Sequence, residues 1–194
     1  MVTGLSTAER ITETALQLFA TCGLAGTSME QVRRDAGVSN GSLYHHFPSR
    51  SALAARLLVE GMDQSQQAVL DAVASTDHAE SAVRAVVTAQ LGWVEAHPDW
   101  ARLLFGDLPD EVLLAAEPTF STQNRHYVHV IDSWWRGQVE RGVVRDFPFE
   151  VAHALWLGPG QELARHWVRG RGRHRLTEVA DLVAEGAWQA LSAP

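Results

Sequence analysis

Hydrogen-bond donors of several kinds are concentrated between positions 40 and 50 of the chain. In chain order they are Asn40, Gly41, Ser42, Tyr44, His45, His46 and Arg50. Asparagine can form two hydrogen bonds with an adenine edge, serine can bond a base or a phosphate, and glycine allows close approach of the backbone. Tyrosine, histidine and arginine donate to phosphate oxygens. These residue types at this spacing are typical of a surface that contacts duplex DNA.

The residues around this cluster predict two short helices that would position it. Thr27 and Glu30 have the spacing of a capping box at the start of the first helix. Gly37 permits a sharp stop, and Ser39 is a good N-cap for a second helix over residues 40–46. Two such helices form a helix-turn-helix unit, whose second helix enters the major groove. The alternative is a small helical hairpin whose tyrosine and histidines only fill the surface. Two kinds of polar aromatic donor and an arginine within seven residues favour DNA binding.

The segment from about residue 6 to residue 56 resembles the TetR/AcrR family of bacterial transcription regulators. The shared residues are Phe19, Gly23, Thr27, Ser28, Met29, Ala36, Gly37, Val38, Ser39, Leu43, Tyr44, His45, His46, Phe47 and Leu53, with a basic residue at position 50. The resemblance implies that Tyr44, His46 and Arg50 hold phosphates and that Asn40 and Ser42 face bases. The predicted DNA contacts are Thr27, Ser28, Ser39, Asn40, Gly41, Ser42, Tyr44, His45, His46 and Arg50.

The chain departs from the family pattern at three positions. Arg33 stands where the family usually has a small residue, and Arg50 and Ser51 replace the more usual lysine and acid. Arg33 is either an additional phosphate contact or a solvated or ion-paired residue, and we favour the second interpretation.

The net charge of −7 is divided unevenly along the 194 residues. Through Arg56 the chain has five arginines and four acidic residues, so the remainder has a net charge of −8. An acidic second part repels DNA, and contact is therefore expected only at the first part.

The composition also limits the class of protein. An apolar content of 46% is enough for a hydrophobic core. Neither a run of ~20 apolar residues nor a signal-peptide pattern is present, so we expect a cytoplasmic protein with no membrane partner. Cys22 is the single cysteine and cannot form an internal disulfide. Its register with Ile11, Ala15 and Leu18 predicts a buried packing thiol, and a redox sensor is the alternative.

Helical periodicity without a strand pattern predicts an all-α fold of about nine helices. A three-helix helix-turn-helix DNA-binding domain is expected over residues 1–50, and a helical effector-binding and dimerisation domain over residues 51–194. The other expected helices span residues 6–22, 50–74, 79–96, 98–105, 119–141, 149–169 and 177–191, with a short helical turn at 109–115. Pro159, between Gly158 and Gly160, should kink or break the helix that contains it.

The family resemblance implies a small effector bound between helices of the second domain. All seven tryptophans lie in that domain. The predicted pocket residues are Trp93, Trp100, Leu103, Leu104, Gln123, His126, Tyr127 and Trp134, and Gln90 and His129 are further polar groups that could orient a ligand. This composition predicts an apolar or aromatic effector. Ordinary core packing is the alternative for each residue.

Two further clusters have weaker interpretations. His126, His129 and Asp132 have a spacing that permits a metal site, but such a spacing arises easily by chance in a chain with nine histidines. We predict no metal and no cofactor. The arginine-rich segment 165–175 is expected to be a solvated connection, and a contact with nucleic acid or an acidic partner is the alternative.

The last two helices have apolar stripes that could form a four-helix bundle with a second copy. The family resemblance implies such a dimer. The predicted interface residues are Leu155, Leu163, Trp167, Leu182, Val183, Gly186 and Ala190. The alternative is that both stripes are buried within one subunit.

No catalytic motif is evident, so we predict that the protein is not an enzyme. The expected function is a homodimeric repressor that binds a palindromic operator in double-stranded DNA and is released by a small effector. Three alternatives remain: an activator, an enzyme hidden in the second domain, and a binding protein without DNA affinity.

Overall fold

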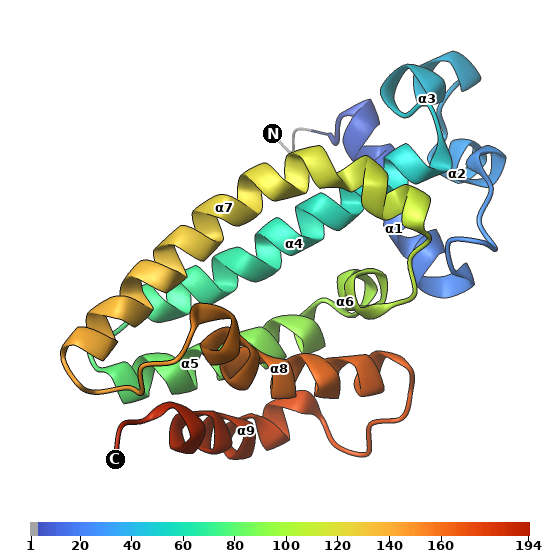
Figure 1. Cartoon of the computed structure of the whole chain (residues 1–194). Coiled ribbons are helices and arrows are strands. Elements are labelled where there is room, and N and C mark those ends of the chain that lie inside the picture. Colours follow the sequence, from blue (N-terminus) through green and yellow to red (C-terminus); the bar gives the residue numbers. More distant parts are fainter. Residues whose placement is uncertain (1–3) are drawn as a thin grey trace.

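The computed structural model describes residues 4–194, which fold into nine α-helices (Figure 1). They are α1 (Thr7–Cys22), α2 (Met29–Asp35), α3 (Asn40–His46), α4 (Arg50–Ala74), α5 (Ala79–Ala96), α6 (Pro98–Phe105), α7 (Asp110–Glu140), α8 (Phe149–Val168) and α9 (Leu176–Leu191). Within this part of the chain the only extended pairing is an isolated bridge between Val144 and Ser192. The predicted all-α fold is confirmed.

The first three helices and the start of α4 share one hydrophobic core. Ser6 and Glu9 form a complete capping box at the start of α1, and these hydrogen bonds hold the pKa of Glu9 below its usual value. Ile11, Leu43 and Leu53 are fully buried in this core. The core also includes residues of α6 and α7, so the helix-turn-helix unit rests on the rest of the molecule.

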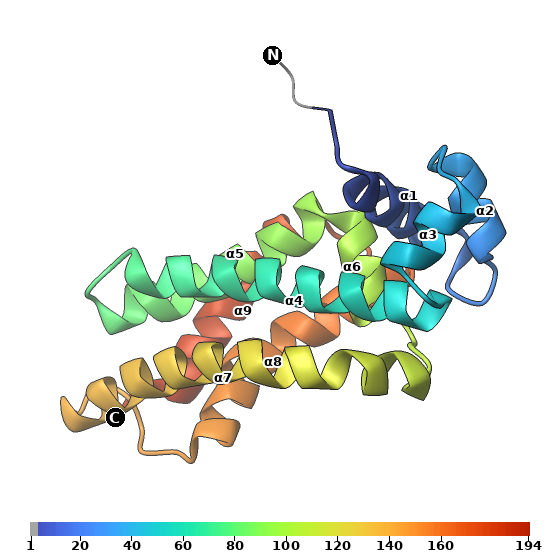
Figure 2. The same cartoon turned by 90° about the horizontal axis from the view of Figure 1, so that it is seen from above.

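Two long helices connect the ends of the molecule. Helices α4 and α7 lie side by side and run in the same direction over most of the length of the molecule (Figures 1 and 2). Helix α5 packs between α4 and α9, and α9 also packs along α8. The second core lies among these helices, where the Trp156 Nε1–H donates to the Val83 carbonyl oxygen at 3.0 Å. Helix α4 therefore contributes to both cores.

Two prolines lie inside continuous helices, so the break that was one expected effect of Pro159 is not found. Residues 109–115 and 119–141 are not separate helices, because α7 is continuous through Pro118. Helix α8 is likewise continuous through Pro159. A proline removes one backbone hydrogen bond and presses its ring against the preceding turn. Both prolines are exposed, so the disturbed turn lies on the solvent side, where water can hydrate the unpaired carbonyl.

Cys22 is exposed, so the prediction of a buried packing thiol is wrong. The cysteine is the last residue of α1, and the helix ends at Gly23 with a positive φ of 73°. Leu24, just beyond the helix end, is buried in the core. The core at this end of α1 therefore contains Leu24 and not Cys22.

None of the helices in residues 4–194 is both long and apolar enough to cross a lipid bilayer.

Candidate functional site

Helix α3 lies at one end of the molecule (Figure 1), and most of its polar residues are exposed. Leu43 is fully buried and anchors the helix, and Phe47 is buried just after it. The Ser42 backbone N–H donates to Ser39 Oγ at 3.1 Å, which confirms Ser39 as the N-cap. The exposed residues of this segment are Ser39, Asn40, Gly41, Tyr44, His45 and His46, while Ser42 is half-buried. An apolar anchor thus leaves the predicted DNA contacts on α3 accessible.

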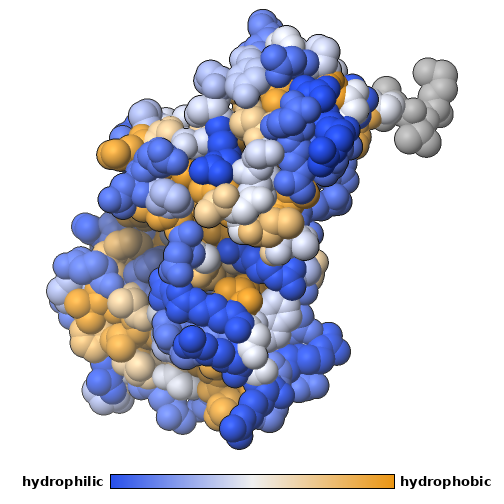
Figure 3. Space-filling model, turned by 90° about the vertical axis from the view of Figure 1, so that its right-hand side faces the viewer, coloured by the Kyte–Doolittle hydropathy of each residue, from blue (hydrophilic) through white to orange (hydrophobic). Residues whose placement is uncertain are grey.

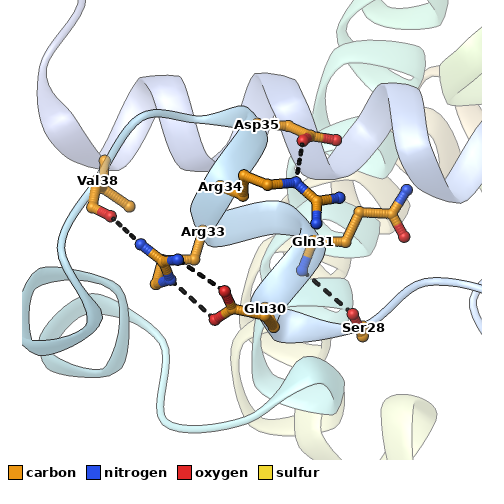
Figure 4. A network of polar contacts seen from close by, with 7 residues as sticks. All are labelled: Ser28, Glu30, Gln31, Arg33, Arg34, Asp35 and Val38. Atoms are coloured by element: carbon orange, nitrogen blue, oxygen red, sulfur yellow. Dashed lines mark hydrogen bonds and ion pairs between the residues drawn. The ribbon is translucent and has the colours of Figure 1, made fainter.

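Arg33 is ion-paired, as the favoured interpretation predicted (Figure 4). Its Nε and Nη2 donate to the two carboxylate oxygens of Glu30 at 2.8 and 2.6 Å, and Nη1 donates to the Val38 carbonyl oxygen at 3.3 Å. The guanidinium holds the pKa of Glu30 below its usual value. This network links α2 to the turn before α3. That turn contains Gly37, whose φ is +64°.

Thr27 does not form the predicted capping box. Its side chain is 1% exposed, and the hydroxyl donates to the carbonyl oxygens of Gly23 and Leu18 at 2.9 and 3.3 Å. The N-cap of α2 is Ser28, whose Oγ accepts the Gln31 backbone N–H at 3.1 Å. Because the Thr27 hydroxyl is buried and already bonded, we remove this side chain from the predicted DNA contacts.

Arg50 connects the start of α4 to the loop before α2. Its Nη1 donates to the Thr27 carbonyl oxygen at 3.0 Å, and Ser49 caps the helix by accepting the Ala52 backbone N–H at 3.0 Å. A guanidinium has five N–H donors, so these contacts leave capacity to bind a phosphate. Seen from the side that bears α2, the upper end of the molecule is mainly hydrophilic (Figure 3).

A cavity of about 320 Å³ lies between α4, α5, α7 and α8. Its lining residues are Met62, Ser65, Gln66, Val69, Gln90, Asn124, Tyr127, Val128, Phe149, Glu150, His153, Leu157 and Gln161. Several of the polar residues are already bonded. The Tyr127 hydroxyl lies 3.3 Å from His153 Nε2, and Gln66 Nε2 donates to Asn124 Oδ1 at 2.9 Å. Burial raises the pKa of Tyr127 and lowers the pKa of His153, so both side chains are neutral near pH 7.

Only one of the eight predicted pocket residues, Tyr127, lines this cavity, together with Gln90. The others lie elsewhere. Trp93 and Leu103 are buried in the two cores, and His126 is exposed. Trp134 packs against Trp156 with tilted rings whose centroids are 5.2 Å apart. Trp100 and Leu104 pack on Gly61 of α4, and Gln123 lines a different hollow.

The contribution of α8 to the cavity was not among the sequence-based predictions. Phe149, His153, Leu157 and Gln161 are spaced four residues apart and so lie on one face of this helix. Polar residues on an otherwise apolar stripe are a signal that could have identified this face.

Ion pairs occur in both the histidine cluster of α7 and the arginine-rich segment 165–175. His126 and His129 are exposed, and Asp132 pairs with Arg136 at 2.9 Å. In the segment between α8 and α9, Arg169 pairs with Asp107 at 3.0 Å, and Arg175 pairs with Glu95 at 2.5 Å.

The predicted interface residues of α8 and α9 divide into two groups. Leu155 and Leu182 are 37% and 76% exposed, and Gly186 is exposed with open space beside it. The remaining predicted residues, Leu163, Trp167, Val183 and Ala190, are half-buried. The buried stripe of α9 is a different one, consisting of Leu176, Ala180, Ala184, Ala187 and Leu191, and the helix packs on both α5 and α8.

Comparison with known proteins relates this geometry to a family. The family described as "Bacterial regulatory proteins, tetR family" matches residues 11–57. The HTH-type transcriptional repressor KstR2 of Mycobacterium tuberculosis is 30% identical over 170 residues, which cover 80% of this chain and 84% of that protein. The uncharacterized HTH-type transcriptional regulator YuxN of Bacillus subtilis is 32% identical over 101 residues, which cover 51% of this chain but only 35% of that protein.

A solved structure supports the fold over nearly the whole chain. The fatty acid degradation regulator FadR from Bacillus halodurans has a TM-score of 0.79 at 17% identity, covering 95% of this chain and 96% of that one. At this identity the likeness is evidence of the fold alone. The match to the family at the helix-turn-helix unit and the alignment with KstR2 over 80% of the chain together show that the chain belongs to the tetR family of bacterial regulatory proteins.

Proposed function

We propose that the protein is a homodimeric transcriptional repressor that binds a palindromic operator through α3 and is released by a small effector. The observation that supports this most strongly is the arrangement of α3, in which Leu43 is fully buried while Asn40, Tyr44 and His46 are exposed. A helix anchored on one face with donors on the other can enter a major groove without unfolding. The repressor name of KstR2 supports repression over activation.

The chemistry of the side chains assigns their roles in this proposal. Asn40 and Ser42 lie in the first turn of α3, where recognition helices contact base edges. Tyr44, His46 and Arg50 would donate to phosphates and so fix the position of α3 along the duplex. His45 is a further exposed donor near the C-terminal end of the helix.

A second copy of the chain would pack against the exposed stripe of α8 and α9. Leu155, Leu182 and Gly186 belong to this stripe, and the inner stripe of α9 is already used on α5. The small Gly186 would allow close approach of two helices. A two-fold symmetric pair would place two α3 helices on the two halves of a palindrome.

Release by an effector requires a connection between the cavity and α3. Helix α4 provides one, because Met62, Ser65 and Val69 line the cavity while Arg50 at its start contacts the loop before α2. A ligand that favours a different tilt of α4 would alter the spacing of the two α3 helices. A preference of about 100-fold for the non-binding form corresponds to roughly 2.7 kcal/mol.

The test is selection of bound fragments from genomic DNA by the purified protein, followed by affinity measurements at several salt concentrations. We expect enrichment of palindromic sites and an affinity that falls steeply as salt increases. A protein that stays monomeric and shows no salt-dependent affinity for any fragment would rule out the proposal.

A further inference from the structure

Gln90 is a buried polar residue without a partner for its carbonyl oxygen. The side chain lines the cavity between α4, α5, α7 and α8, and the residue is 5% exposed. Its Oε1 has no hydrogen-bond partner among the described residues. A buried amide oxygen without a hydrogen-bond partner is unfavourable, so a ligand that pairs with this amide would be favoured by satisfying it.

The space beside Gln90 depends on a glycine of α8. A Cβ atom at position 160 would lie 2.6 Å from Gln90 Oε1, so any larger residue there would displace the amide. At position 158, two residues earlier on the same helix, a Cβ atom would meet nothing within 4 Å. Gly160 therefore leaves room for the Gln90 amide at the wall of the cavity.

The charges around the cavity disfavour an anion. Glu150 is the only charged residue among the lining residues, and it is negative. His153 is the other titratable base in the lining, and burial lowers its pKa, so it is neutral near pH 7. Transfer of a carboxylate or phosphate from water into such a site has no compensating ion pair.

We propose that the effector is an uncharged molecule whose polar head both donates and accepts hydrogen bonds, such as a carboxamide or a lactam, and that this head pairs with the Gln90 amide. An amide has one acceptor and two donors and can turn end for end about its last bond, so Gln90 can meet such a head with two hydrogen bonds. Apolar groups of the ligand would contact Val69, Phe149 and Leu157. The proposal rests on the cavity being the effector site of the proposed function.

Three probes of nearly equal shape test the head group. They are 4-phenylbutanamide, 5-phenylpentan-2-one and 4-phenylbutanoate, which present an amide, a ketone and a carboxylate on the same phenylalkyl tail. Each is added at millimolar concentration to the full-length protein at pH 7.5 without DNA, and thermal unfolding is followed because a ligand of the folded state raises Tm. We expect the amide to bind about 5–10-fold more tightly than the ketone and the carboxylate to give no shift.

Two variants connect the effect to Gln90. Gln90→Met keeps the length of the side chain but removes the amide. In this variant the affinity for the amide probe should fall to that for the ketone. Gly160→Ala should weaken binding of the amide probe by pushing the Gln90 side chain into the cavity. Gly158→Ala is its matched control and should leave binding unchanged.

Several results would overturn the proposal: no Tm shift with the amide, equal shifts with all three probes, a larger shift with the carboxylate, or an amide advantage that persists in Gln90→Met and Gly160→Ala. Each is measured without DNA. Failure of the proposed DNA binding would therefore appear only in the operator assay and would not alter these results.

Discussion

At the scale of single residues, Asn40 is the residue that we propose contributes most to base reading. Its side chain is exposed in the first turn of α3, and an asparagine that bonds an adenine edge contributes about 1–3 kcal/mol of discrimination. Asn40→Ala should therefore weaken binding to the preferred operator by that amount and leave binding to random DNA almost unchanged, as measured by competition titration. Tyr44→Phe is the comparison, because loss of a phosphate donor should weaken both DNAs alike. Equal weakening by Asn40→Ala would remove this residue from the base contacts.

Arg50 should contribute to affinity without contributing to sequence preference. Arg50→Ala should weaken binding to all sequences alike and reduce the slope of log affinity against log salt by about 1, because one phosphate contact is lost. Arg102→Ala is the matched control, since it removes the same charge from α6, where Arg102 pairs with Asp99 at 3.0 Å. An unchanged slope in Arg50→Ala would leave Arg50 only its contact with the Thr27 carbonyl oxygen.

The sequence predicts some side-chain roles in the helix-turn-helix unit and not others. The cap at Ser39 and the pairing of Arg33 are confirmed, because each depends on residues within five positions of one another. Thr27 and Ser28 are adjacent hydroxyl residues, and either could cap α2. Which one does so depends on the backbone path after α1, and that path is set by the packing of Leu24.

At the scale of helices, substitutions of Ser28, the N-cap of α2, should affect stability and DNA binding differently. Ser28→Ala removes the acceptor for the Gln31 backbone N–H and should lower the free energy of unfolding by about 1 kcal/mol in a urea titration. Ser28→Asp restores a cap and should recover that stability. If Ser28 also lies beside a phosphate, the aspartate should still weaken DNA binding by repulsion. Full recovery of both properties in Ser28→Asp would show that Ser28 only caps the helix.

The contact between α7 and α8 should make stability depend on pH. Burial lowers the pKa of His153 in the folded state, so below the usual histidine pKa of about 6.5 the unfolded chain takes up a proton first. The free energy of unfolding should therefore decrease between pH 7.5 and pH 5.5, and the decrease should be smaller in His153→Asn. His174→Asn, at an exposed position between α8 and α9, should keep the wild-type dependence. Identical pH profiles for the two variants would contradict this assignment.

Helix positions were predictable from periodicity, but helix pairing was not. The bounds of α5 and α6 agree with the sequence-based ranges, whereas the two helices expected at 109–115 and 119–141 are one helix that contains Pro118. A proline ends a helix only when its neighbours cannot tolerate the missing hydrogen bond, and this depends on which side of α7 faces solvent. The lining of the cavity could not be predicted for a similar reason. Gln90 and His153 are 63 positions apart, and only the packing of four helices brings them to one cavity.

At the scale of the whole molecule, the two cores are joined by α4 and not separated by a linker. Residues Leu53 and Leu57 lie in the core of the helix-turn-helix unit, and Val69 and Val73 of the same helix lie in the other core. A shift of α4 at the cavity would therefore displace side chains packed against α1, and α1 in turn packs against α3. This continuity supports the proposal that ligand occupancy and DNA affinity are coupled through a change in the position of one helix.

The dimer proposal can be tested with two leucines that are almost equally exposed. Leu182 on α9 is 76% exposed and Leu114 on α7 is 74% exposed, so replacing either with glutamate should cost the monomer little stability. Leu182→Glu would place charges against the symmetry-related helix, where an unpaired buried charge is strongly unfavourable. We expect this variant to be monomeric by light scattering and to lose most of its affinity for a full palindrome while keeping weak affinity for a half-site. Leu114→Glu should remain dimeric. A dimer that persists in Leu182→Glu but dissociates in Leu114→Glu would show that the interface lies at the start of α7 and not on α8 and α9. The spacing of the two α3 helices would then be set by that contact.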